Sequence, residues 1–145
     1  MIGGKIMLIY GYRASGKTYN LFISHAWKYE ADYNTVVSWL EDSNLKYKNY
    51  SVPQHAPLDA NNTKKLKEQL TNQIRPSSIV IVISGMYAAY SDWIDYEIDE
   101  AVRMEKTILG LKPWGSERIP QKIQDHADEM VGWQSKSLID AIKRH

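Results

Sequence analysis

Residues 78–84 read Ser78-Ile79-Val80-Ile81-Val82-Ile83-Ser84, which is the most apolar run in the chain. The run is short, rich in β-branched residues and followed by Gly85, so it predicts a fully buried central strand. A helix is expected next, over residues 92–105, with Ser91 or Asp92 as its N-cap. A buried strand followed by a covering helix is the repeating unit of α/β proteins.

The helix expected over 92–105 presents two different faces. Its apolar residues recur at helical spacing and predict the side that covers the sheet: Ile94, Ile98, Ala101, Val102 and Met104. Trp93 and Glu97 are four residues apart, so they share another face near the start of the helix. The first turns of such helices lie at the carboxyl edge of a parallel sheet, where ligands bind. The spacing therefore predicts a carboxylate and an indole together at that edge.

The rest of the chain alternates short apolar runs with helical patterns. Strands are expected at 19–24, 47–51, 107–111 and 130–131, and helices at 32–41, from about 63 to 75, from 120 onward and around 138–142. This alternation predicts a five-stranded parallel sheet covered on both faces, a three-layer α/β sandwich. The absence of a glycine-rich dinucleotide fingerprint favours the flavodoxin-like strand order 2-1-3-4-5. One domain is expected over 17–145, after a lead-in at 1–16 that includes a strand at 5–10.

Composition indicates one globular domain. The 145 residues suffice for a single core and are too few for two domains of ordinary size. A net charge of +1 argues against nucleic acid or a membrane surface as a partner, and no apolar run is long enough to span a bilayer. There is no cysteine and no signal-peptide pattern, so a cytoplasmic protein is expected. The four histidines are too scattered to predict a metal site.

Residues 11–18 fit the phosphate-loop pattern GxxxxGK[ST]. That loop needs a helix that starts at Lys17, because the N-terminal amides of the helix hold the phosphates. The residues that follow, 19–24, alternate as a strand does. The buried run also ends at Ser84, where an Asp would help to hold magnesium. A nucleoside-triphosphate site is therefore not favoured.

Two functions that share this strand order are excluded by the residues that follow the strands. A phosphorelay receiver needs an acidic pair after the first strand and an acceptor Asp after the third. The chain has Ser24-His25 and Ser84-Gly85 at those places. A flavodoxin needs a hydroxyl- and glycine-rich phosphate loop after the first strand, where this chain has His-Ala-Trp-Lys at 25–28.

The candidate site residues also have ordinary explanations. A lone histidine such as His25 is more often a hydrogen-bonding residue than a catalyst. Glu97 belongs to a helix rich in acidic residues, and on spacing alone a solvated surface carboxylate is the simpler interpretation. Spacing by itself therefore leaves the role of both residues open.

Five stretches together resemble one known family. Residues 19–25 resemble the first box of Toll/interleukin-1 receptor (TIR) domains, and residues 93–97, Trp-Ile-Asp-Tyr-Glu, resemble the WxxxE motif of NAD-consuming TIR enzymes. Residues 49–53, 84–87 and 112–120 resemble the bacterial TIR-like family of Thoeris antiphage systems, which includes the ThsB subunit. The resemblance covers nearly the whole chain beyond the lead-in.

The resemblance implies a flavodoxin-like fold and an enzyme whose catalytic residue is Glu97. It implies that NAD is the substrate, without a separate cofactor or metal, and that the nicotinamide glycosidic bond is hydrolysed, often with cyclisation of the ADP-ribose. The product would be a signal that activates a partner effector protein. The residues expected to bind the substrate are Phe22, Ser24, His25, Ser84 and Trp93.

A second class of function stays open, because many TIR-like domains are adaptors that act by self-association without activity. The aromatic residues Tyr87, Tyr90, Trp93 and Trp114 would then form an interface. A homo-oligomer is compatible with either function. Release of free nicotinamide from NAD would distinguish the enzyme from the adaptor.

Overall fold

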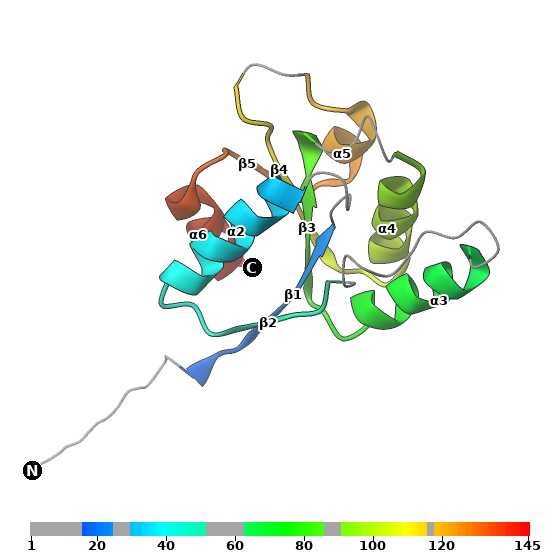
Figure 1. The fold of residues 1–145 in the computed structure, drawn as a ribbon, viewed down its shortest axis with the longest axis horizontal. Coiled ribbons are helices and arrows are strands. Elements are labelled where there is room, and N and C mark those ends of the chain that lie inside the picture. Colours follow the sequence, from blue (N-terminus) through cyan, green and yellow to red (C-terminus); the bar gives the residue numbers. More distant parts are fainter. Residues whose placement is uncertain (1–15, 25–29, 52–62, 86–90, 116–117) are drawn as a thin grey trace, which may run out of the picture.

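The described part of the chain forms a five-stranded parallel sheet with helices on both faces (Figure 1). A computed structural model describes residues 16–24, 30–51, 63–85, 91–115 and 118–145. The strands are β1 (Tyr19–Ser24), β2 (Tyr47–Asn49), β3 (Ile79–Ile83), β4 (Thr107–Leu111) and β5 (Glu129–Val131). The helices are α2 (Glu30–Asp42), α3 (Thr63–Ile74), α4 (Ser91–Arg103), α5 (Gln121–His126) and α6 (Ser135–Arg144).

Strand β3 is the centre of the sheet. Its five residues are all buried, and it pairs with β1 on one side and β4 on the other. An uninterrupted β-branched run is stable there because helices cover both faces of the strand. Strands β2 and β5 complete the order β2-β1-β3-β4-β5 at the two edges. The predicted parallel sheet and its flavodoxin-like order are therefore confirmed.

Two layers of helices enclose the sheet (Figure 1). Helices α2 and α6 pack together on one face, whereas α4 contacts both α3 and α5 on the other face. Parallel strands require crossover connections, so every strand ends at the same edge of the sheet and the next helix begins near that edge. This edge is where ligands bind in open α/β sheets.

Helix α4 shows how the apolar pattern becomes packing. Ile94, Ile98 and Ala101 are buried in the core, as predicted, but Val102 is 45% exposed. Each residue turns the helix by about 100°, so Ala101 lies about 20° from Ile94 and Val102 about 80° from it. The prediction for Val102 is wrong because the buried face of α4 is narrower than its apolar spacing suggests.

Strand β2 ends at Asn49, two residues before the predicted end at Ser51. The Asn49 Oδ1 atom accepts hydrogen bonds from the backbone N–H and the hydroxyl of Ser51, at 2.9 and 2.6 Å. This local turn takes Ser51 out of the strand ladder. The Ser51 hydroxyl oxygen instead accepts the backbone N–H of Ile23 in β1, at 3.0 Å. The other predicted elements agree with the structure to within three residues at each end.

Residues 16–18, the first that the structure describes, test one requirement of a phosphate loop, which is a helix that starts at Lys17. Lys17 and Thr18 lead directly into β1, and no helix begins at either residue. Lys17 and Thr18 therefore do not supply the free N-terminal amides of a helix that a phosphate loop uses to bind phosphates. Residues 11–15 and the strand expected at 5–10 lie outside the described residues.

The packing of α4 can be tested with two substitutions on the same helix. We expect Ile98→Ala to lower the free energy of unfolding by about 2–5 kcal/mol, because removal of this fully buried side chain leaves a cavity in the core. Val102→Ala should change it by less than about 0.5 kcal/mol, since Val102 is half exposed. Urea unfolding of both variants measures the difference, and equal losses would contradict this orientation of the helix.

Candidate functional site

The site is built on one buried contact between the sheet and a helix. Ser24, the last residue of β1, donates a hydrogen bond from its Oγ to Oε1 of Glu97 on α4, at 2.6 Å. Ser24 is buried, and Glu97 is only 5% exposed. The contact joins residues 73 positions apart at the carboxyl edge of the sheet. We call it the Ser24–Glu97 pair.

Helical geometry explains why Glu97 turns inward while Trp93 does not. Glu97 lies about 60° around α4 from the buried Ile94, and Trp93 lies about 100° from it. Glu97 therefore reaches the end of β1, whereas Trp93 faces sideways and is half buried. Trp93 lines a hollow of about 490 Å³ between α3 and α4, and the residues that line this hollow do not include Glu97.

Burial changes the acid–base behaviour of Glu97. It raises the pKa of Glu97 from its ordinary 4.5 to about 8, while the hydrogen bond from Ser24 acts in the opposite direction. A carboxyl group in an apolar setting resists ionisation until a cation or further hydrogen-bond donors arrive. Its two protonation states are therefore close in free energy near neutral pH, which is typical of functional sites at a strand edge.

A second buried hydroxyl lies at the same edge. Ser84 directly follows β3 and is 3% exposed, and its Oγ has no hydrogen-bond partner among the residues that the structure describes. An unsatisfied buried hydroxyl costs about 1–3 kcal/mol, so such groups call for an explanation. Since β1 and β3 are neighbouring parallel strands, Ser84 and the Ser24–Glu97 pair lie at adjacent strand ends.

The other predicted binding residues are placed differently. Phe22 precedes Ser24 by two residues, so it points to the same face of the sheet, and it is fully buried in the core. It therefore supports the floor beneath Ser24 rather than presenting a surface. His25 lies outside the described residues.

Asp32, in the first turns of α2, is an acidic group near this edge that the sequence analysis did not single out. Its Oδ2 lies 3.8 Å from the position that a Cβ on Gly85 would occupy, and Pro113 lies on the same side at 3.6 Å. The signal was available, because α2 follows β1 and so begins at the carboxyl edge. Asp32 was missed because it belongs to no motif.

No group of three or more His, Cys, Asp or Glu side chains in the described ranges is arranged to hold a metal ion. No helix there is both long enough and apolar enough to cross a membrane.

Comparisons with known proteins give one family and one fold relative. The family model described as "Thoeris protein ThsB, TIR-like domain" matches residues 22–118. The structure of the Clostridium botulinum CMP N-glycosidase BcmB is similar with a TM-score of 0.55 at 12% sequence identity, over 87% of this chain and 99% of that one. At that identity the likeness shows a shared α/β fold. No curated protein sequence matches the chain.

The raised pKa of Glu97 predicts a pH-dependent stability. The folded chain keeps a proton on Glu97 up to about pH 8, whereas the unfolded chain releases it near pH 4.5. Between these values Glu97 should therefore lower the free energy of unfolding by up to about 1.4 kcal/mol per pH unit as pH rises. Glutamine does not titrate, so Glu97→Gln should gain stability over the wild type from pH 5 to pH 8.

Urea unfolding at pH 5, 6, 7 and 8 measures this difference, because titrations shared by the two proteins cancel in it. Curves of free energy against pH that run parallel for wild type and Glu97→Gln would contradict the burial of a neutral Glu97.

Proposed function

The chain belongs to the family of ThsB TIR-like domains of Thoeris, and from this premise we propose that it cleaves the nicotinamide glycosidic bond of NAD. The observation that carries the proposal is the buried Ser24–Glu97 pair at the ligand-binding edge. The matched range includes Ser24, Ser84, Trp93 and Glu97. The fold relative is named as an N-glycosidase, and the proposed reaction breaks a bond of the same class.

The reaction needs stabilisation of positive charge on a sugar. The bond between C1′ of the ribose and the pyridinium nitrogen breaks, and its electron pair leaves with nicotinamide, which departs neutral. The ribose then carries the oxocarbenium-like charge typical of glycosyl transfer. A carboxylate that is already in position offsets this charge without reorganisation of solvent. Glu97 is the group proposed for this role.

The raised pKa of Glu97 suits both steps of the reaction, the departure of nicotinamide and the attack of a nucleophile on C1′. Entry of the cationic pyridinium favours ionisation of a buried carboxyl group, so Glu97 becomes charged when the substrate arrives. A nucleophile then attacks C1′ and loses a proton, which the Glu97 carboxylate accepts. A carboxylate with a pKa of about 8 is a stronger base at neutral pH than an ordinary one.

The neighbouring side chains would bind the dinucleotide. The Ser84 hydroxyl, which has no partner among the described residues, would bond a ribose hydroxyl or the carboxamide. Trp93 would stack on a flat ring, and Phe22 beneath Ser24 would help to keep water scarce. His25 is proposed to bind a polar group of the substrate.

Scarcity of water would decide which nucleophile attacks C1′. If water attacks, the product is ADP-ribose; if a ribose hydroxyl or the adenine of the same molecule attacks, the product is cyclic. We propose the cyclic product, which would act as a signal that activates a partner effector protein in antiphage defence. The protein would work in the cytoplasm on free NAD, without a further cofactor.

One observation favours an adaptor that acts by self-association. Trp114 is 76% exposed, and an indole so open to water is common where proteins meet. Trp93 is half buried in its hollow, and Tyr87 and Tyr90 lie outside the described residues. A homo-oligomer through Trp114 is compatible with catalysis at Glu97, because Trp114 follows β4 whereas Glu97 lies on α4.

The catalytic role of Glu97 is tested by measuring the small molecules that phage-challenged cells produce. Extracts of phage-challenged cells that express the wild type should contain free nicotinamide and an ADP-ribose product. Glu97→Gln should lower both at least about a hundredfold at equal levels of soluble protein. The matched control is Asp42→Asn, an exposed carboxylate at the end of α2, which should behave as the wild type. Equal product from Glu97→Gln and the wild type would leave the adaptor as the remaining function.

Ser24 should tune Glu97 rather than perform chemistry. Its hydrogen bond lowers the pKa of Glu97, so Ser24→Ala should move the rising limb of the pH–rate profile to higher pH by about one pH unit. Ser24→Thr keeps the hydroxyl and should restore the profile. An unshifted profile in Ser24→Ala would mean that the pair does not set the protonation state of Glu97.

A further inference from the structure

The segments that follow β4 and β5 line a hollow of about 480 Å³ at the carboxyl edge of the sheet. Two indoles contribute to it, Trp114 from the segment after β4 and Trp133 from the segment after β5. The backbone N–H of Lys112 donates to the carbonyl oxygen of Val131 at 2.7 Å, so the two segments start from strand ends that are bonded to each other. We call this feature the indole hollow.

The backbone on either side of Trp114 holds its indole at the surface. Pro113 is buried, and its Cβ lies 3.6 Å from the position that a Cβ on Gly85 would occupy, so this segment lies beside the end of β3. Gly115 has a φ of 87°, a left-handed conformation that glycine adopts without strain. Trp114 is 76% exposed between these two constrained neighbours, and a flat ring can stack on it.

The second indole is supported by helix α2. Trp133 is half buried and makes a T-shaped contact with Trp39 of α2, with 4.8 Å between the ring centroids and 62° between the ring planes. Trp39 does not itself line the indole hollow. The orientation of Trp133 is therefore set by packing before a ligand arrives, which lowers the entropy cost of binding.

A side-chain amide lies beside the two indoles. Gln134, directly before α6, lines the indole hollow and is exposed. Its side chain makes no cap hydrogen bond with α6, so the amide is available to a ligand. A glutamine amide can bond N6 and N7 of adenine as a pair, accepting from the first and donating to the second. Two indoles and such an amide together match an adenine ring.

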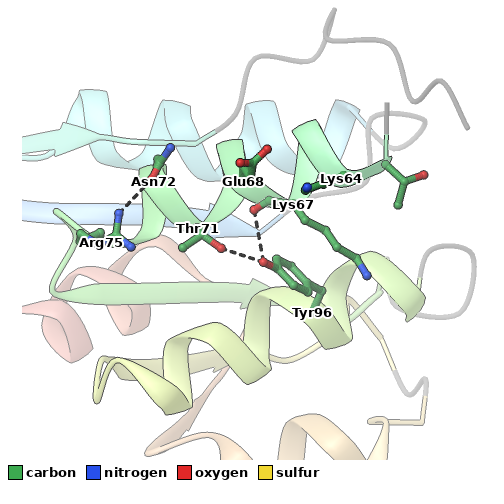
Figure 2. A pocket seen from close by; sticks show the side chains of 8 residues that line it. Lys64, Lys67, Glu68, Thr71, Asn72, Arg75 and Tyr96 are labelled. Atoms are coloured by element: carbon green, nitrogen blue, oxygen red, sulfur yellow. Dashed lines mark hydrogen bonds between the residues drawn. The ribbon is translucent and has the colours of Figure 1, made fainter. Parts of the chain in front are cut away.

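The two hollows beside α4 suit an uncharged ring less well. Tyr96 is the aromatic residue among those that line the larger one, of about 650 Å³, and its hydroxyl oxygen lies 2.7 Å from that of Thr71 (Figure 2). The hollow beside Trp93 has one lysine and three aspartates, and the aspartates would repel the phosphates of a nucleotide. The described residues that line the indole hollow include no carboxylate.

We propose that the indole hollow binds the adenine base of a soluble nucleotide, stacked on Trp114 and bonded by Gln134. Strand β4 lies two strands from β1, about 10 Å at the usual strand spacing, so the adenine end of a dinucleotide at the Ser24–Glu97 pair can reach the hollow. The base has two possible sources, this dinucleotide and a separate adenine nucleotide. Only the first source rests on the proposed function, because binding is measured without turnover.

The test is calorimetric titration of the full chain with AMP. We expect binding that weakens at least fivefold in Trp114→Ala, because the base loses an aromatic ring on which it stacks. Trp114 is 76% exposed, so this variant should fold, and circular dichroism checks it. The matched control is Trp93→Ala, which removes the indole of a different hollow and should change the affinity for AMP less than twofold.

UMP carries the same ribose and phosphate as AMP, so it isolates the contribution of the base. It should bind the wild type at least fivefold more weakly than AMP, and Gln134→Leu should reduce this preference. Absence of AMP binding at millimolar concentration, equal affinity for UMP, or equal losses in Trp114→Ala and Trp93→Ala would overturn the proposal. So would a Trp114→Ala variant that changes the oligomeric state in size-exclusion chromatography but keeps its affinity for AMP, since Trp114 would then join copies of the chain.

Titration of Glu97→Gln with NAD, with and without saturating AMP, identifies the source of the base. Weaker NAD binding in the presence of AMP would assign the indole hollow to the adenine of the dinucleotide, whereas unchanged NAD binding would assign it to a separate nucleotide. AMP binding without any NAD binding would support the indole hollow and contradict the proposed function. The two proposals therefore fail separately.

Discussion

The hydrogen bond between the Ser24 hydroxyl and the Glu97 carboxyl places an ionisable group where the fold is otherwise apolar. An isolated charge is costly in such a place, so the carboxyl group keeps its proton to a higher pH and its pKa is raised. A ligand that brings positive charge can change that state. The chemistry proposed for the chain follows from this one constraint.

The fold supplies the constraint through its connectivity. Parallel pairing of β1 with β3 aligns the strand ends that carry Ser24 and Ser84. The crossover after β3 then returns as α4, which carries Glu97 inward to β1. The same helix points Tyr96, the adjacent residue, toward α3. One helix thus contacts both the carboxyl edge of the sheet, through Glu97, and α3, through Tyr96.

Periodicity predicted the elements, because buried strands and covering helices leave local patterns, and the absence of a glycine-rich fingerprint favoured the strand order. Local patterns carried less information on the site. The spacing of Trp93 and Glu97 predicted the two side chains together, whereas in the structure Glu97 bonds Ser24, 73 residues away in the sequence, and Trp93 lines a hollow that Glu97 does not line. The sequence pattern also did not show that Ser84 is buried without a partner in the described chain. Such facts depend on tertiary packing.

The central claim is that burial beside Ser24 keeps the Glu97 carboxyl group protonated, and therefore uncharged, at neutral pH. Carbon-13 NMR titration of the Glu97 side-chain carboxyl carbon, assigned with Glu97→Gln, measures this directly in the folded chain without substrate. The account predicts a midpoint near pH 8, as the burial of the group requires. A midpoint near 4.5, the ordinary value for a solvated glutamate, would contradict it.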